Sequence, residues 1–361
     1  MKSKIFIFSI SLFSIILMGA SCIKVGSKDA GPMGVYRSLD KGDTWEAVTA
    51  FPTPQGVKSI SSLKIYRIFE DPSDSNAFYL GTRGQGLFYT YDNGDSWQEV
   101  KFFSGKFIYA LAVDPKDKCT IYASDGATIY KTTDCSRTWN LVFTETRANE
   151  RFVSIAIDNK NARAIYALQL NGDLLVSRDE GKTWQTIKRF GFQAQQMEVD
   201  HKVADRIFVA SYRKGLYRSD DGGKNWVTLN EELKKIGNDT FNFYRLVLNT
   251  AQKDSLYWIS KYGILRSDDA GQTWTELKLL TPPGSITILA FDVNEKNPKE
   301  IYYTGSQLGE KNVHIKSTFY KSSDGGIKWE TKKLPTNTLP VMIKVNPKND
   351  NNLLMGFTVL N

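Results

Sequence analysis

Short apolar stretches alternate with polar turns along almost the whole chain. The stretches are rich in Ile, Val, Tyr and Phe and end in Asp, Asn, Pro or Gly, as in IYALAVDPKDKCTIYAS (108–124) and YRLVLNTAQKDSLYWIS (244–260). β-Branched and aromatic residues between such breaks are typical of β-strands joined by tight turns. No long stretch repeats its apolar residues at helical spacing. The pattern therefore predicts an all-β protein built from many short strands.

One eight-residue motif, Ser/Thr-x-Asp-x-Gly-x-Thr/Ser-Trp, recurs seven times with small variations. The copies occupy 38–45, 90–97, 132–139, 177–184, 219–226, 267–274 and 322–329. Their aspartates are Asp40, Asp92, Asp134, Asp179, Asp221, Asp269 and Asp324, and their tryptophans are Trp45, Trp97, Trp139, Trp184, Trp226, Trp274 and Trp329. Successive tryptophans lie 42 to 55 residues apart. A period of this size predicts a β-propeller whose blades have four strands.

Each residue type in the motif has a structural task. The Asp carboxylate accepts hydrogen bonds from the residues that follow it and closes a turn between two strands. The Gly supplies a positive φ, and the Trp offers a large apolar face for burial between blades. The acids in DNGD and DDGG suggest calcium loops as an alternative, but no Glu closes a twelve-residue loop. We therefore interpret the motif residues as fold residues without a catalytic role.

The two ends of the chain carry complementary parts of one repeat. Residues 34–48 supply a third strand, a motif and a fourth strand, whereas residues 341–360 supply only a first and a second strand. Six complete units lie between them. We therefore predict a single propeller of seven four-stranded antiparallel blades, with the N- and C-terminal strands closing the ring in one blade. Closure removes the exposed sheet edges that an open ring would present.

With these seven motifs the chain resembles the Asp-box, or bacterial neuraminidase repeat, family of β-propellers over residues 36–361. Similar propellers occur in sialidases, sortilin-type receptors, xyloglucanases, and photosystem II assembly and stability factors. The resemblance implies the propeller fold. It leaves the function open, because enzymes, receptors and scaffolds share this repeat.

The start of the chain has the composition of an export signal. A basic beginning precedes an apolar run at 5–18, which is shorter than the ~20 residues of a membrane span. The segment resembles a bacterial lipoprotein signal that ends at Cys22, although Gly19 stands where Leu is usual. Secretion without a lipid and an uncleaved anchor are the alternatives. We expect a signal peptide at 1–21, a lipidated Cys22 with a tether at 22–33, and an exported propeller at 34–361, held at the cell membrane or outer membrane and facing the periplasm or exterior.

Charge and cysteine content narrow the class of protein. The formal net charge is +8, and the basic residues are spread along the chain rather than clustered, so we expect no nucleic-acid partner. Cys119 and Cys135 lie in turns predicted on one face of the same blade. They are candidates for a disulfide in an exported protein, and two buried thiols are the alternative. The cysteine spacing fits no zinc site, and we expect neither a metal nor a cofactor.

Catalytic groupings are sparse. His201 and His314 are the only histidines, which argues against a Ser-His-Asp site or a His-based metal site. The segment YRIF (66–69) comes nearest to a sialidase Arg-Ile-Pro motif, but it lacks the proline and is better explained as a first strand. A glycoside hydrolase needs two carboxylates at a defined separation, and most acids here belong to motif turns. A glycoside hydrolase of Asp-box propeller type is the alternative function.

The remaining candidate is a binding surface on the face opposite the motif turns. The turns between the second and third strands of each blade are expected there. They carry Arg83, Arg213, Lys214, Lys261 and Tyr262. These residues suit an acidic peptide, an anionic glycan or an acidic protein surface, with ordinary solvated charges as the alternative. We expect a non-enzymatic monomer, tied to the membrane by a lipid, that binds a protein or glycan at the cell envelope.

Overall fold

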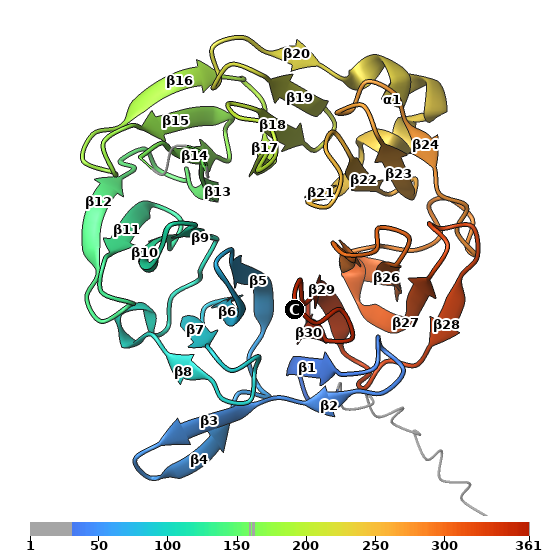
Figure 1. Ribbon diagram of the computed structural model, residues 1–361, viewed down its shortest axis with the longest axis horizontal. Coiled ribbons are helices and arrows are strands. Elements are labelled where there is room, and N and C mark those ends of the chain that lie inside the picture. The colour runs from blue at the N-terminus through green and yellow to red at the C-terminus, as the bar shows by residue number, and fades with distance from the viewer. Residues whose placement is uncertain (1–30, 159, 161–162, 361) are drawn as a thin grey trace, which may run out of the picture.

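In the computed structural model, which describes residues 31–158, 160 and 163–360, the chain forms a ring of seven four-stranded antiparallel sheets around a central axis (Figure 1). In the first six blades the strands follow one another in chain order from the axis outward. The predicted fold class and blade number are confirmed. The predicted signal peptide and Cys22 lie outside the described residues.

Each of the first three blades consists of four strands that follow one another in the sequence. The first blade contains β5 (Ile65–Asp71), β6 (Asp74–Thr82), β7 (Leu87–Thr90) and β8 (Gln98–Glu99). The second contains β9 (Ala110–Asp114), β10 (Asp117–Ser124), β11 (Thr128–Thr132) and β12 (Asn140–Thr144). The third contains β13 (Phe152–Ile157), β14 (Ile165–Gln169), β15 (Asp173–Ser177) and β16 (Gln185–Arg189).

The next three blades repeat this plan. The fourth contains β17 (Ala194–Val199), β18 (Ile207–Ser211), β19 (Gly215–Ser219) and β20 (Val227–Thr228). The fifth contains β21 (Phe243–Leu248), β22 (Leu256–Ser260), β23 (Ile264–Ser267) and β24 (Thr275–Glu276). The sixth contains β25 (Phe291–Val293), β26 (Ile301–Leu308), β27 (His314–Ser322) and β28 (Glu330–Lys332).

The seventh blade joins the two ends of the chain. It contains β29 (Leu339–Val345), β30 (Leu353–Thr358), β1 (Gly34–Ser38) and β2 (Glu46–Ala47). β1 pairs with β30 over five residue pairs, from Gly34 opposite Phe357 to Ser38 opposite Leu353. The predicted closure by 34–48 and 341–360 is therefore confirmed, and every blade has both of its neighbours.

Apolar side chains of adjacent blades fill the space between them. Phe319 of the sixth blade, for example, belongs to the same buried cluster as Ile343 of the seventh. Trp97 of the first blade is fully buried, and its indole N–H donates to the carbonyl of Val48 after β2 at 2.8 Å. A four-stranded sheet exposes two apolar faces, so a blade buries them only between neighbours.

The motif Asp organises each motif turn. In the first copy, Asp40 Oδ1 accepts hydrogen bonds from the Ser38 hydroxyl at 2.7 Å and from the Thr44 backbone N–H at 2.8 Å. Its Oδ2 accepts the Thr44 hydroxyl at 2.6 Å. Partial burial opposes ionisation, but these hydrogen bonds outweigh it and lower the pKa of Asp40 to about 2. The carboxylate is thus held ionised as the centre of the turn.

The motif glycine lies against the preceding blade. A Cβ at Gly223 would lie 2.6 Å from Cδ1 of Ile187 in the third blade, and Gly223 has a φ of +89°. In the motif of the fifth blade, the residue before the glycine also contacts the preceding blade. The Ala270 carbonyl there accepts a hydrogen bond from Arg218 of the fourth blade at 2.8 Å. The glycine is therefore required both by the turn and by the joint between blades.

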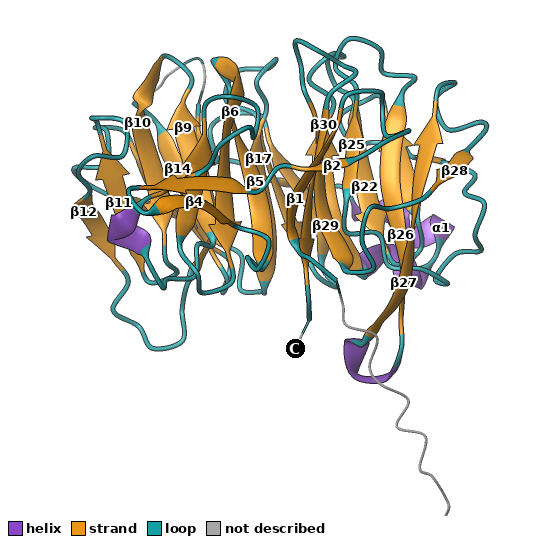
Figure 2. Cartoon of the chain, turned by 90° about the horizontal axis from the view of Figure 1, so that it is seen from below, coloured by secondary structure: helices purple, strands orange, loops and turns teal. Residues whose placement is uncertain are grey.

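Several elements lie outside the repeat. The hairpin of β3 (Ala50–Thr53) and β4 (Gly56–Ser59) projects outward from the ring (Figure 1). The chain also forms helix α1 (Asn230–Ile236) and the 3-10 turns η1 (Lys101–Phe103), η2 (Asn238–Phe241) and η3 (Glu310–Asn312). Residues 305–317 stand at the position of the turn that the repeat places between second and third strands. Most of them instead extend β26 and β27 into a hairpin that projects from one face (Figure 2).

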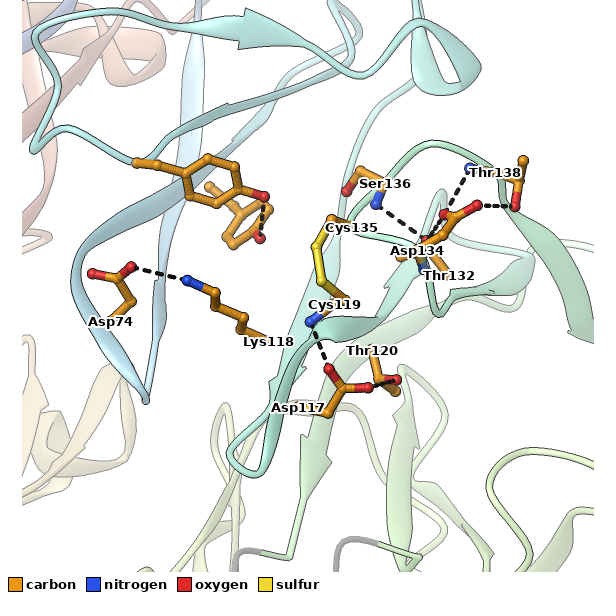
Figure 3. Close-up of a disulfide and its surroundings, with 12 residues drawn as sticks. Asp74, Asp117, Lys118, Cys119, Thr120, Thr132, Asp134, Cys135, Ser136 and Thr138 are labelled. Atoms are coloured by element: carbon orange, nitrogen blue, oxygen red, sulfur yellow. Dashed lines mark hydrogen bonds and ion pairs between the residues drawn. A yellow bond between two sulfur atoms is a disulfide. The ribbon is translucent and has the colours of Figure 1, made fainter.

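Cys119 and Cys135 are joined by a disulfide in the second blade (Figure 3). Cys119 lies in β10 and Cys135 in the motif turn after β11, so the bond ties the second strand to that turn. The backbone N–H of Cys135 donates to the carbonyl of Cys119 at 3.3 Å. This motif copy differs from the other six in having Ser136 at the glycine position.

Candidate ligand-binding face

The five residues predicted to bind a partner lie in turns between second and third strands, at the blade ends opposite the motif turns. Arg83 lies between β6 and β7 in the first blade. Arg213 and Lys214 lie between β18 and β19, and Lys261 and Tyr262 lie between β22 and β23. The first blade is across the ring from the fourth and fifth (Figure 1). The five residues therefore form two groups.

The group on the fourth and fifth blades is partly neutralised by its own chain. Lys261 forms an ion pair with Asp239 at 3.3 Å. The Tyr262 hydroxyl donates a hydrogen bond to Glu276 at 2.9 Å. Arg213 is exposed, and its guanidinium lies 5.1 Å from the centre of the Tyr212 ring.

Arg83 lies beside a cluster of three aromatic rings. Tyr66 is the second residue of β5, the innermost strand of the first blade. Its ring centre lies 4.9 Å from that of Phe107 and 6.1 Å from that of Tyr109. Phe107 and Tyr109 stack at 4.1 Å with an angle of 15° between their planes. Both precede β9, so the rings bridge the innermost strands of the first two blades. All three rings are half-buried.

Three guanidinium groups lie over these rings. Those of Arg67 and Arg83 lie 5.4 and 5.3 Å from the centre of Tyr66, and that of Arg151 lies 5.4 Å from the centre of Tyr109. Cation–π contact holds such groups while leaving N–H donors free for a ligand. We call the six residues the Arg–aromatic patch: Tyr66, Arg67, Arg83, Phe107, Tyr109 and Arg151.

The patch arginines differ from most other arginines in their lack of acidic partners. Within the part of the chain that the structure describes, no carboxylate lies within ion-pair distance of Arg67, Arg83 or Arg151. Nε of Arg83 is buried and has no hydrogen-bond partner there. By contrast, Arg206 pairs with three carboxylates, those of Asp200, Asp220 and Asp254. The positive charge of the patch is therefore not neutralised by any carboxylate of the described chain.

Positive charge continues from the patch toward the axis. Arg245 of β21 donates to the Val341 carbonyl at 3.1 Å. Burial lowers the pKa of Arg245 to about 10, and the nearby charge of Arg67 acts in the same direction. An anion near these two guanidinium groups would relieve both effects. The end of the axis near Arg67 is therefore an anion-attracting environment.

The other part of the axis carries carboxylates. Glu70 of β5 forms an ion pair with Lys344 of β29 at 2.6 Å. Burial raises the pKa of Asp292 in β25 to about 7, although Lys344 acts in the opposite direction. The Asp292 carboxyl accepts the Val345 backbone N–H at 2.8 Å and is only 8% exposed. Both carboxyl groups thus have partners within the fold.

Only Arg83 of the six patch residues was predicted from the sequence to bind a partner. The other five are Tyr66, Arg67, Phe107, Tyr109 and Arg151. One signal was available: Tyr66 and Tyr109 each stand five positions before the Asp that ends a first strand, at Asp71 and Asp114. The repeat therefore places both tyrosines at the same end of neighbouring inner strands. Arg151 gives no such signal, because it belongs to the connection into a third blade.

The sequence matches the Sortilin-Vps10 family model, described as sortilin, neurotensin receptor 3, over residues 33–147, 90–215 and 214–356. The chain belongs to the Sortilin-Vps10 family. The three overlapping matches agree with the internal repeat, and together they span nearly the whole ring. The membership supports the resemblance to Asp-box propellers.

Two curated relatives of this Sortilin-Vps10 chain are much longer enzymes. The chain is 33% identical to xyloglucanase Xgh74A of Acetivibrio thermocellus over an alignment of 134 residues that covers 30% of this chain and 16% of the relative. It is 31% identical to a xyloglucanase of Paenibacillus sp over an alignment of 142 residues that covers 32% of this chain and 14% of that enzyme. The chain thus spans only about a seventh of these enzymes.

Solved structures show the same fold at low identity. The GH74 xyloglucanase of Xanthomonas campestris matches with a TM-score of 0.65 and 15% identity, over 90% of this chain and 52% of that enzyme. YCF48 bound to a D1 peptide matches with a TM-score of 0.58 and 18% identity, over 91% of this chain and 98% of that protein. At these identities the likeness concerns the fold alone.

The described residues contain neither a membrane-spanning helix nor a cluster of metal-binding side chains. None of their helices has the length and apolar character needed to cross a membrane. No three His, Cys, Asp or Glu side chains among them are arranged to hold a metal ion.

Proposed function

We propose that this chain is an exported, membrane-anchored propeller that binds an acidic segment of a partner protein through the Arg–aromatic patch. The observation that carries the proposal is the set of three guanidinium groups that lie over the clustered rings of Tyr66 and Tyr109 without a carboxylate partner in the described chain. Guanidinium groups bind carboxylates through paired N–H donors, and aromatic rings add apolar contact. The function is binding, not catalysis.

The structural relatives supply a precedent for this reading. The match covers 98% of YCF48, so one propeller makes up nearly all of that structure, as it does here. YCF48 has been solved with a D1 peptide bound. The Xanthomonas xyloglucanase is matched over about half of its length. The single ring of this chain is therefore closer in extent to the peptide-binding relative.

A glycoside hydrolase is the second candidate, and one observation favours it. Asp292 has a pKa near 7, as a general acid requires, and Glu70 lies near the same Lys344. However, Glu70 is neutralised by Lys344 at 2.6 Å, and Asp292 is almost fully buried. Binding therefore remains the function we propose. Release of reducing ends from xyloglucan oligosaccharides, abolished by Asp292→Asn, would instead establish the enzyme.

The binding proposal is tested with fluorescent peptides of acidic and neutral sequence. The wild-type chain should bind the acidic peptides more tightly, and the difference should shrink as salt is added, because mobile ions screen exposed charges. Replacing Arg83 and Arg151 together by Glu should weaken binding of the acidic peptides. Polarisation titrations at low and high salt measure both effects.

A matched control makes the same charge change on the other face. Lys182 and Lys224 are exposed residues of motif turns, and replacing both by Glu should leave acidic-peptide binding nearly unchanged. The melting temperature of the Lys182 and Lys224 double variant should stay close to wild type, because exposed charges contribute little to stability. Arg83 and Arg151 are part-buried against aromatic rings, so peptide binding by their double variant is measured below its own melting temperature, with folding checked by circular dichroism. Equal losses in the two double variants would show that net charge, and not the patch, attracts the peptide.

A further inference from the structure

The β26–β27 hairpin of the sixth blade projects beyond the ring on the face opposite the motif turns (Figure 2). Its strands are eight and nine residues long. In the fourth blade, for comparison, β18 ends at Ser211 and β19 begins at Gly215. We call residues 307–316 the sixth-blade tip. The tip therefore reaches farther from the ring than an ordinary turn would.

The tip exposes apolar side chains at its end. Val313 is 61% exposed and Ile315 is 62% exposed. Lys311 and Lys316, both exposed, flank them, and Glu310 is an exposed acid of the same segment. Two large exposed apolar side chains with neighbouring lysines are typical of a segment that enters a lipid interface, where apolar groups sit below the headgroups and lysine amines reach outward.

The base of the hairpin is held by side-chain hydrogen bonds. The hydroxyls of Ser306 and Ser317 lie 2.7 Å apart and bond across the two strands. The Ser317 hydroxyl also bonds to Nε2 of His314 at 2.8 Å. These contacts brace the strands where they leave the ring, so that Val313 and Ile315 are held away from it.

The chain enters the ring next to this hairpin. The Thr336 hydroxyl donates to the Pro32 carbonyl at 2.9 Å. His314 forms a hydrogen bond with the backbone of Asn337, the residue after Thr336. Residue 32 and the hairpin base are thus linked through two adjacent residues, Thr336 and Asn337.

The length of chain before residue 31 limits how far this face can lie from an anchor. Eight residues separate Cys22 from Gly31, and the nine steps from one Cα to the next span at most about 30 Å in a fully extended chain. An anchor at Cys22 would therefore keep the face that carries the tip close to the bilayer. The motif turns would point away from it.

We propose that the sixth-blade tip contacts the membrane surface, with Val313 and Ile315 at the boundary between headgroups and acyl chains and Lys311 and Lys316 near anionic phosphates. This inference rests on the membrane anchoring that is part of the proposed function. It also turns the Arg–aromatic patch toward the membrane. The partner is then a polypeptide that emerges from, or is held at, the bilayer.

The test compares two positions on the same blade in the full-length lipidated chain. Ile315 and, separately, Ile327 are replaced by Cys and labelled with a polarity-sensitive fluorophore. Ile327 is 76% exposed and lies in the motif turn of the sixth blade, so it reports the opposite face. The chain is reconstituted on vesicles of phosphatidylcholine and phosphatidylglycerol that contain nitroxide-labelled lipids. Quenching and a blue shift of emission are expected at position 315 and not at position 327.

A second variant checks that the apolar groups cause the contact. Val313→Asp with Ile315→Asp should abolish protection of the tip from a soluble protease on vesicles, and Ile327→Asp should leave that protection unchanged. Vesicle-bound chain without quenching at position 315, or with equal quenching at both positions, would overturn the inference while leaving anchoring intact. Failure of the chain to associate with vesicles would overturn both. A dimer that shields position 315 without vesicles would assign the tip to a second copy instead.

Discussion

Replacing Ser136 by Gly should stabilise the protein. Ser136 occupies the position that holds Gly in the other six motifs, and its φ is +69°. A non-glycine residue with a left-handed backbone costs about 1–2 kcal/mol. Its hydroxyl oxygen is buried and has no hydrogen-bond partner within the described residues, which adds about 1 kcal/mol at the low end of the usual cost. The backbone N–H of Ser136 bonds to the Thr132 hydroxyl at 3.2 Å and is unaffected by the change.

Two effects oppose this gain. Glycine makes the unfolded chain more flexible, which costs about 0.5–1 kcal/mol. The lost side chain also removes a small amount of packing. The net expectation is a gain of about 1 kcal/mol. Scaling the usual entropy of unfolding per residue to a ring of roughly 330 residues gives a rise in melting temperature of about 1.5 °C.

Urea and thermal unfolding followed by tryptophan fluorescence measure this difference. Ser136→Ala is the matched variant, because it removes the hydroxyl but keeps the left-handed backbone of a residue with a Cβ. Gly94→Ser should do the reverse in the second motif, since a Cβ there would lie 3.2 Å from Cγ2 of Val48 at a φ of +91°. A Ser136→Gly protein no more stable than Ser136→Ala would refute the role of backbone strain.

Three further predictions concern the same turns. Asp92→Ala should lower the free energy of unfolding by about 1–3 kcal/mol, because the Asp92 carboxylate accepts bonds from Thr90 at 2.6 Å and Ser96 at 3.0 and 2.6 Å; urea unfolding checks this, and an unchanged midpoint would contradict it. Replacing Cys119 and Cys135 together by Ser should cost about 3 kcal/mol, as the bond closes a loop of separation 16; a reductant should destabilise the wild type equally and leave the variant unaffected. Hydrogen bonds from Thr138 and Thr183 lower the pKa of Asp134 and Asp179 from 3.8 to about 2 in the folded protein. The two ionised carboxylates therefore stabilise the fold above pH 4, and this stabilisation should be lost as the pH falls toward 2. Unfolding midpoints measured across this pH range should fall less steeply for Asp179→Asn than for the wild type.

Much of the binding face could not be predicted from the sequence. The turn that carries Arg83 follows from the repeat, because its place between second and third strands is set by the motif spacing. The ring contacts of Arg83 depend on Tyr66 in the same blade and on Phe107 and Tyr109 near the next one. Likewise, Lys261 resembles a free surface charge in the sequence, but Asp239 in η2 neutralises it at 3.3 Å.

The sequence by itself determined the strands, the number of blades and the closure by the two ends. These follow from a local pattern, since the motif Asp and its Ser or Thr partners lie within four residues of each other, as in Ser38, Asp40 and Thr44. Only the tertiary structure decided which side chains meet across blades. Three contacts join residues from different blades or chain ends: the packing of Gly223 on Ile187, the cation–π contact of Arg151 with Tyr109, and the hydrogen bond from Thr336 to the Pro32 carbonyl. Such contacts depend on how the blades tilt and close around the axis, which no local pattern specifies.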